Sequence, residues 1–143
     1  MKSINLILFS IAFFSFLDYG IAQSKKKADK ETAIWRYELE PAGTGIQGSY
    51  QIKVWSYSKK AETAIEQAKK NAVHGIIFKG FPSKERLSGQ KALAQNPNLE
   101  EVKSEFFKEF FQDGGKYLKF VTLVNNGAIA SEDRIKIGKE YKI

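Results

Sequence analysis

The sequence predicts an α+β fold, in which two helices pack on one face of a mostly antiparallel sheet, in the order β-β-α-β-α-β-β. Two early segments alternate apolar and polar residues, which is the period of a half-buried strand. Two later segments repeat apolar residues every three or four positions, as an amphipathic helix does. Strand-like segments follow each helix, and this mixed order favours helices on one side of antiparallel strands.

The first two predicted strands form a hairpin. Residues 34–40 alternate in polarity, and residues 49–57 alternate again, with Tyr50, Ile52 and Val54 on one face. The connector between the two runs is rich in glycine. Two alternating runs around such a connector predict a hairpin with a long loop.

The first predicted helix covers residues 59–73, and Ser58 offers an N-cap. Its apolar stripe consists mostly of alanine, so we expect the helix axis to approach the sheet closely. His74 and Gly75 suit the end of this helix, and residues 75–81 then predict a short buried strand. The members of the stripe are Ala61, Ala64, Ile65, Ala68 and Ala72.

A second helix is predicted after an exposed loop at residues 83–98. It begins at Leu99 and stops at the glycine pair Gly114-Gly115. Helical spacing places Phe106 and Phe110 in the core. The adjacent residues Phe107 and Phe111 widen the stripe, so we expect Phe107 or Phe111 to be partly exposed and available to a partner.

The end of the chain predicts two more strands. Residues 116–124 give the strongest strand pattern, and Asn126-Gly127 suits a hairpin turn. Residues 134–143 predict a final strand with a bend at Gly138. This strand stops without a closing turn, so either the coding chain ends there or a longer domain has been cut short.

The N-terminus predicts export. A positive start, a short apolar run and small residues before Ala22 are the order of a secretory signal peptide, residues 1–22, cut after Ala22. The apolar run is too short for a spanning helix, so we expect no transmembrane helix in the mature chain. Residues 23–31 predict a flexible basic tail containing Lys25, Lys26 and Lys27, and residues 32–143 form a single α+β domain. The mature protein is therefore expected in the periplasm, at the cell surface or secreted.

Composition narrows the chemistry. The chain has no cysteine and a single histidine, His74, which excludes thiol catalysis, cysteine-rich metal sites and His-pair metal sites. We expect neither a metal nor a cofactor. The net charge of +7 suits an anionic envelope partner, such as polysaccharide or lipopolysaccharide. The charges outside the basic tail are mixed in sign, which favours solubility as the reason for this charge.

The segment 43–48, called the glycine loop below, matches the pattern G-x-G-x-x-G. A dinucleotide site needs those glycines between a strand and a helix N-terminus, whereas here a strand follows. We therefore expect no nucleotide cofactor. The loop is instead a candidate contact surface, because glycines let a partner approach the backbone closely. Its candidate residues are Gly43, Thr44, Gly45 and Gly48.

Three other groups of side chains suggest weaker candidate sites. Glu38 and Glu40 share one face of the first strand and could serve a small hydrolase, although a chain this short seldom builds the required cleft. His74 has no patterned partners, which favours a structural or partly exposed role. Trp35 and Tyr37 could stack on sugars or bases, but sheet packing explains them as well.

Two phrases carry a resemblance to a known group of proteins. Residues 69–80, KKNAVHGIIFKG, and residues 110–117, FFQDGGKY, resemble an uncharacterised family of small exported proteins of Bacteroidota bacteria. The resemblance spans nearly the whole mature chain and implies location but no mechanism. It also implies that the chain continues past the final strand. More loosely, the strand and alanine-striped helix look like envelope domains of flagellar-assembly proteins and small outer-membrane lipoproteins.

The leading functional prediction is a non-catalytic, envelope-associated domain that binds another envelope protein through the glycine loop and the phenylalanine-rich helix. The first alternative is a binder of anionic envelope polymer, through the basic tail and the strand aromatics. This alternative predicts binding that weakens steeply with salt. The second alternative is a small hydrolase.

Overall fold

The computed structural model describes residues 35–143, of which 125 and 126 are described by their backbone alone. It confirms an α+β fold with a mostly antiparallel sheet. The predicted signal peptide (1–22) and basic tail (23–31), with Lys25, Lys26 and Lys27, lie outside the described residues. Within residues 35–143, no helix is long and apolar enough to cross a membrane.

The main sheet has the order β1-β2-β6-β5, and its neighbouring strands are antiparallel. The predicted first hairpin is confirmed: β1 (Tyr37–Gly43) pairs with β2 (Gln51–Ser58), and Leu39 lies opposite Val54. The predicted final strand is two short strands, β5 (Ile135–Ile137) and β6 (Glu140–Lys142). The predicted bend at Gly138 is their turn, where φ is +60°.

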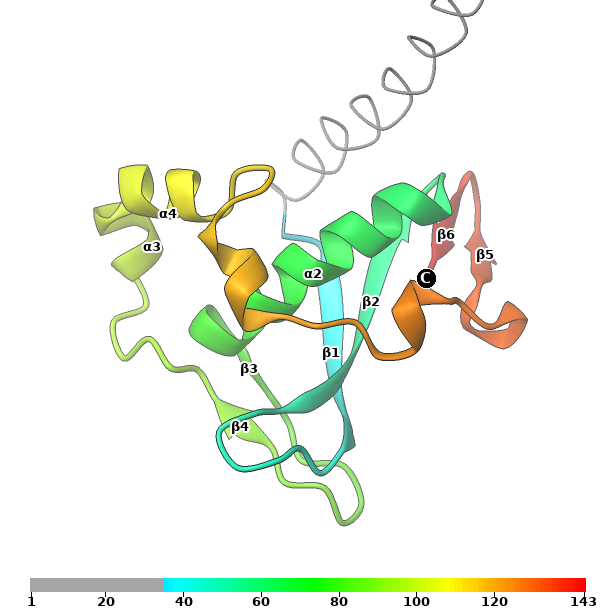
Figure 1. The fold of residues 1–143 in the computed structure, drawn as a ribbon, viewed down its shortest axis with the longest axis horizontal. Helices are drawn as coiled ribbons and strands as arrows, with labels where there is room; N and C mark the ends of the chain where they lie inside the picture. Colours follow the sequence, from blue (N-terminus) through cyan, green and yellow to red (C-terminus); the bar gives the residue numbers. More distant parts are fainter. Residues whose placement is uncertain (1–34) are drawn as a thin grey trace, which may run out of the picture.

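Helix α2 (Ala61–Phe78) lies across β1 and β2 (Figure 1). The predicted end of this helix at His74 and Gly75 is wrong, because the helix continues to Phe78 and the amide of Lys79 still donates to the Gly75 carbonyl at 2.9 Å. Gly75 instead allows close packing on the sheet, since an added Cβ would overlap Leu39 Cδ1. The helix ends before Gly80, whose φ is +69°.

The longer helix leaves little of the strand predicted at residues 75–81. Only β3 (Gly80–Phe81) remains, and it pairs with β4 (Gln90–Lys91) in a separate two-stranded sheet. β4 lies in the segment predicted as an exposed loop. The chain then runs back along α2, where the amides of Leu93 and Ala94 donate to carbonyls near the helix end.

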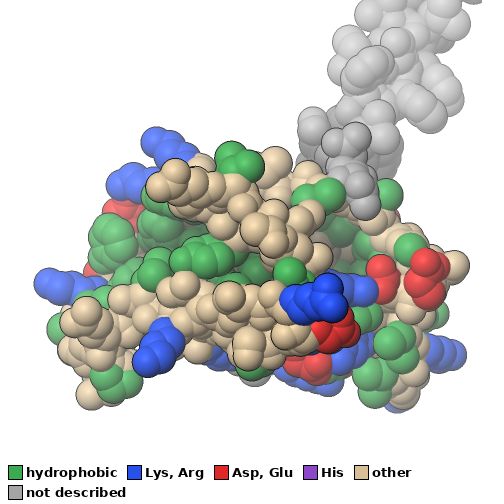
Figure 2. All heavy atoms as spheres, turned by 90° about the horizontal axis from the view of Figure 1, so that it is seen from below, with side chains coloured by type: hydrophobic (Ala, Val, Ile, Leu, Met, Phe, Trp, Pro, Cys, Tyr) green, Lys and Arg blue, Asp and Glu red, His purple; other side chains and the backbone are tan. Residues whose placement is uncertain are grey.

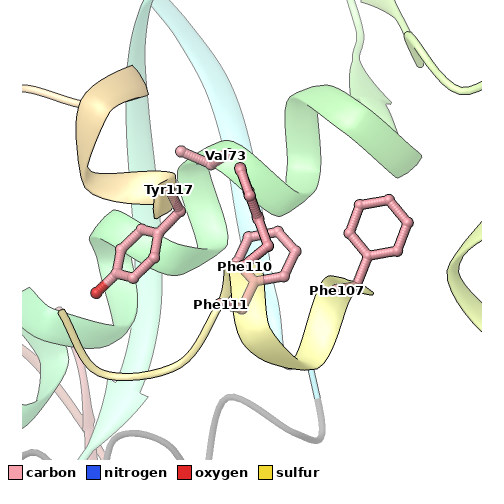
Figure 3. Packing of buried hydrophobic residues seen from close by; sticks show 5 residues of the cluster. All are labelled: Val73, Phe107, Phe110, Phe111 and Tyr117. Carbon is pink, nitrogen blue, oxygen red and sulfur yellow. The ribbon is translucent and has the colours of Figure 1, made fainter. Parts of the chain in front are cut away.

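The second predicted helix is two short ones, α3 (Leu99–Val102) and α4 (Ser104–Phe110), separated at Lys103. This break changes which phenylalanine side chains of the predicted apolar stripe face the core. Phe107 is buried, whereas Phe106 is 54% exposed, so the prediction of a core Phe106 and an accessible Phe107 or Phe111 is wrong. In Figure 3 the core side chains of α4 cluster beside α2. The core cluster comprises Val73, Phe107, Phe110, Phe111 and Tyr117.

The strand predicted at residues 116–124 is also wrong. Residues Lys116–Phe120 form a 3-10 helix, η1, which places Tyr117 in the core with no exposed surface. A second 3-10 turn, η2 (Val124–Gly127), replaces the predicted hairpin at Asn126-Gly127, and a third, η3, covers Ser131–Asp133. This segment returns past α2 toward β5 (Figure 1). β2 pairs with β6.

Candidate functional site

His74 forms the most elaborate polar network in the described part of the chain. Its Nδ1 lies 2.6 Å from the Tyr37 hydroxyl, and its Nε2 lies 3.1 Å from Glu100 Oε2. A carboxylate only accepts, so Nε2 carries the proton and Nδ1 accepts from Tyr37. Trp35 Nε1 donates to the other oxygen of Glu100 at 2.9 Å. The network therefore joins β1, α2 and α3.

Aromatic rings enclose this network. The Trp35 ring stacks on His74 with 3.6 Å between ring centroids, and Phe78 and Phe111 pack around the same imidazole. Burial lowers the pKa of His74 to about 4, against the opposing effect of Glu100. Burial also raises the pKa of Tyr37. A neutral, enclosed imidazole with both nitrogens bonded serves to fix three elements together, so the structure favours the structural role predicted for His74.

Trp35 and Tyr37 belong to this packing and do not form an open stacking platform. The strand predicted at residues 34–40 is wrong at Trp35, which precedes β1 in a turn with φ +48°, and its ring covers His74. Tyr37 begins β1 and directs its hydroxyl at the same imidazole. Lys79 Nζ lies 3.9 Å from the centroid of the Tyr37 ring and further covers it.

Glu38 and Glu40 do share one face of β1, the face turned away from α2. Each accepts one hydrogen bond from a lysine and one from an aromatic side chain, and these donors lie outside β1. The hydrogen bond from Lys142 at 2.5 Å, with that from Tyr57, lowers the pKa of Glu38. The bond from Lys84, with that from Trp55, lowers the pKa of Glu40. Glycoside hydrolysis needs one carboxyl that is protonated near neutral pH, and neither of these two is held in that state.

The aromatic side chains on this outer face of the sheet are covered by cations. Arg36 lies 4.0 Å above the Tyr57 ring, and Lys53 lies 4.3 Å above the Trp55 ring. These cations are also paired with acids, Arg36 with Glu140 and Lys53 with Asp133. Each of these two cations on the outer face therefore has an acidic partner.

A concave feature lies on the other side of β2. It is a groove of 1040 Å³ bounded by β2, α2 and residues 120–129. Figure 2 shows it as a hollow with hydrophobic side chains on its floor. This volume is slightly above the range of about 300–1,000 Å³ typical of ligand sites. Apolar side chains from all three boundaries line it: Ile52, Val54, Ala64, Ile65, Ala68, Ala72, Ile76, Val121, Leu123 and Ile129.

The alanine stripe explains why the groove exists. Ala64, Ala68 and Ala72 all line it, and their short side chains leave space between the helix and residues 120–129. Gly75 of the same helix packs closely on the sheet. Ala68 is half-buried, whereas Ala64 and Ala72 are buried, so the stripe lies at the bottom of the groove.

The glycine loop forms one end of the groove. Thr44, Gly45 and Gly48 line it, whereas Gly43 ends β1 outside the lining. Gly45 is packed closely, since an added Cβ would lie 2.6 Å from the Ser49 carbonyl oxygen, and Gly48 has a φ of +82°. Ile46 at the tip is 83% exposed and also lines the groove. The structure thus brings the glycine loop and the alanine stripe to one site, while Phe107 and the His74 network lie elsewhere.

One feature of the sequence indicates this site: the apolar stripe of the helix consists mostly of alanine, whose side chain fills little space. Within residues 35–143, no group of three or more His, Asp or Glu side chains is placed to hold a metal ion. Comparison with known protein families, curated proteins and solved structures finds no match to this chain. The resemblance to exported Bacteroidota proteins stays a prediction.

Proposed function

We propose that this protein is a non-catalytic, exported binding domain that holds an apolar segment of another cell-envelope protein in the groove. The observation that carries the proposal is the groove itself, 1040 Å³ in volume and lined mainly by aliphatic side chains. A concave apolar surface of this size on a small domain is typical of an interaction site. The proposed export rests on residues 1–22.

The polar side chains support the non-catalytic part of the proposal. His74 is enclosed and bonded at both nitrogens, and Glu38 and Glu40 are each bonded to a lysine. None of the three lines the groove, and Asp133, the acid that does, is paired with Lys53. A hydrolytic site would need an acid or a base free to act in the space that holds the substrate.

No observation in the described residues favours the anionic-polymer alternative. Its aromatic side chains on the outer sheet face are covered by cations that already pair with acids. Its basic tail lies outside the described residues. The groove, by contrast, offers an unfilled apolar surface.

Site-specific photocrosslinking in the native host tests the proposal. A photoreactive amino acid replaces Ala68, which lines the groove, or Ala61, a matched alanine of the same helix that does not. We expect one envelope protein to be captured from position 68 and not from position 61. Capture of lipid alone from position 68, or equal capture of the same proteins from both positions, would contradict the proposal.

A further inference from the structure

We propose that Trp35 is a displaceable cover of a second binding site, which takes the indole ring of a ligand in place of the Trp35 side chain. The site consists of the His74 imidazole, the Glu100 carboxylate and the Phe111 ring. It is independent of the groove, because none of these residues lines the groove. Two observations carry the inference: the strained backbone of Trp35 and the specific contacts that its ring makes.

The backbone of Trp35 has a φ of +48°. This left-handed conformation is costly for a bulky side chain, and it persists only where the surrounding contacts hold it. Here the side chain makes those contacts, because its ring stacks on His74 and its Nε1 donates to Glu100 Oε1 at 2.9 Å. Release of the ring would relieve the backbone strain, so the strain lowers the free energy that opening requires.

Trp35 can leave its position without disturbing the sheet. It lies in a turn, and the pairing of β1 with β2 begins two residues later, at Tyr37. The residue is half-buried, so part of it already faces solvent. Its carbonyl accepts a hydrogen bond from the exposed Lys79 side chain at 3.2 Å. The cover is therefore held in place mainly by its own ring.

The site beneath the cover keeps its other contacts when Trp35 leaves. The Tyr37 hydroxyl fixes His74 at Nδ1, and Glu100 Oε2 fixes it at Nε2. Phe78 packs against the same imidazole, with 4.8 Å between the ring centroids. The Glu100 side chain is 36% exposed, so a ligand can reach the carboxylate from solvent.

The contacts of the Trp35 ring define the ligand. The imidazole face accepts a flat ring, because the indole stacks on His74 with 3.6 Å between centroids and 16° between planes. Phe111 meets the indole in a T-shaped contact at 5.1 Å. Glu100 Oε1 requires a donor, since a carboxylate only accepts. A flat aromatic group with an N–H on its edge meets all three requirements. The ligand is therefore an indole, either free or in a tryptophan side chain of a peptide.

Indole itself is the probe, and N-methylindole, which lacks the donor, is its control. The chain has two tryptophans, so fluorine NMR of the tag-free, fluorotryptophan-labelled protein gives two signals, which Trp55→Phe assigns. Trp55 also donates to a glutamate but lies within β2, so its signal is the internal control. Trp35→Gly removes the cover and suits the positive φ. Ala68→Phe fills the groove and excludes binding there.

We expect indole to move the wild-type Trp35 signal toward the position of a solvent-exposed tryptophan and to leave the Trp55 signal in place. Trp35→Gly should bind indole at least about tenfold more tightly than the wild type, because the cover no longer competes. N-methylindole should bind both proteins at least about tenfold more weakly than indole, because the hydrogen bond to the carboxylate is lost. Ala68→Phe should leave the affinity for indole unchanged.

A wild-type Trp35 signal that stays in place up to the solubility limit of indole would overturn the proposal, since the cover would then be permanent. Equal affinities for indole and N-methylindole would overturn the proposed ligand class. Both results come from the wild type, so they are decisive even if Trp35→Gly does not fold. A further titration with N-acetyltryptophanamide separates the two sources of the ligand: binding of this compound indicates a tryptophan side chain, and binding of indole alone indicates the free compound.

Discussion

Acidification from pH 7 to pH 5 should destabilise this protein through His74. The imidazole is 3% exposed, and burial lowers its pKa from 6.5 to about 4, although the Glu100 carboxylate opposes this effect. The unfolded chain binds a proton near pH 6.5. Between these two pKa values the unfolded state therefore holds more protons than the folded state, so stability falls as the pH falls.

The size of the effect follows from the two pKa values. One pKa unit corresponds to about 1.4 kcal/mol, so the change from pH 7 to pH 5 removes about 2 kcal/mol of unfolding free energy. The measurement stays at or above pH 5 for a physical reason. The folded-state pKa values of Glu38 and Glu40 are lowered by hydrogen bonds from lysines, so these carboxylates begin to contribute an acid loss of their own below their unfolded values.

Urea unfolding of the wild type and of His74→Gln at both pH values provides the assay. The variant keeps a neutral side chain that bonds but does not titrate, so the wild type should lose about 2 kcal/mol more than the variant. His74 is the only histidine of the chain, so its ring protons also report the folded-state midpoint directly in a tag-free NMR titration. A midpoint above 6.5, or a wild type that gains stability at pH 5, would refute the reasoning. Either result would mean that a protonated His74 forms an ion pair with Glu100.

Three further predictions concern packing and processing. Gly75→Ala should cost about 1–3 kcal/mol in urea unfolding, because its Cβ would overlap Leu39 Cδ1, and an unchanged midpoint would exclude that close packing. Thr63→Val should be neutral or stabilising by up to about 1 kcal/mol, because Oγ1 is buried without a hydrogen-bond partner; a loss of more than about 1 kcal/mol would reveal a bond. Mass spectrometry of the exported protein should find Gln23 as its first residue, and an N-terminus that retains Met1 would contradict export by cleavage.

Local pattern was sufficient for the elements whose packing obeys a simple period. The β1–β2 hairpin followed from alternation in polarity, because one face meets α2 and the other meets solvent. The body of α2 followed from its alanine spacing. Its end did not, because Gly75 looks like a helix terminator in sequence and acts as a packing glycine against Leu39. Only the tertiary contact separates these two roles.

Tertiary context also overrode the pattern in the second half of the chain. Residues 116–124 read as a strand, yet Tyr117 is drawn into the core and the local backbone becomes a 3-10 helix. The break at Lys103 likewise exchanges the roles of Phe106 and Phe107. Of the predicted contact surfaces, the glycine loop lines the groove. Its position could be predicted because the hairpin that carries it follows from the sequence pattern. The groove was not predictable, since it depends on where residues 120–129 return.

The groove links the stability of the domain to its partner. Ala68 of α2 and Val121 lie on two boundaries of the groove. A segment that binds only the folded state must raise its stability, by about 2.7 kcal/mol when present at one hundred times its dissociation constant. Such a gain should slow the exchange of those amides of β2 and α2 that exchange only through global unfolding. A ligand that touched only the glycine loop would give the same gain at the same ratio of concentration to dissociation constant. Ala68→Phe, which fills the groove, should therefore remove the gain for a segment held there and leave it for a ligand of the loop alone.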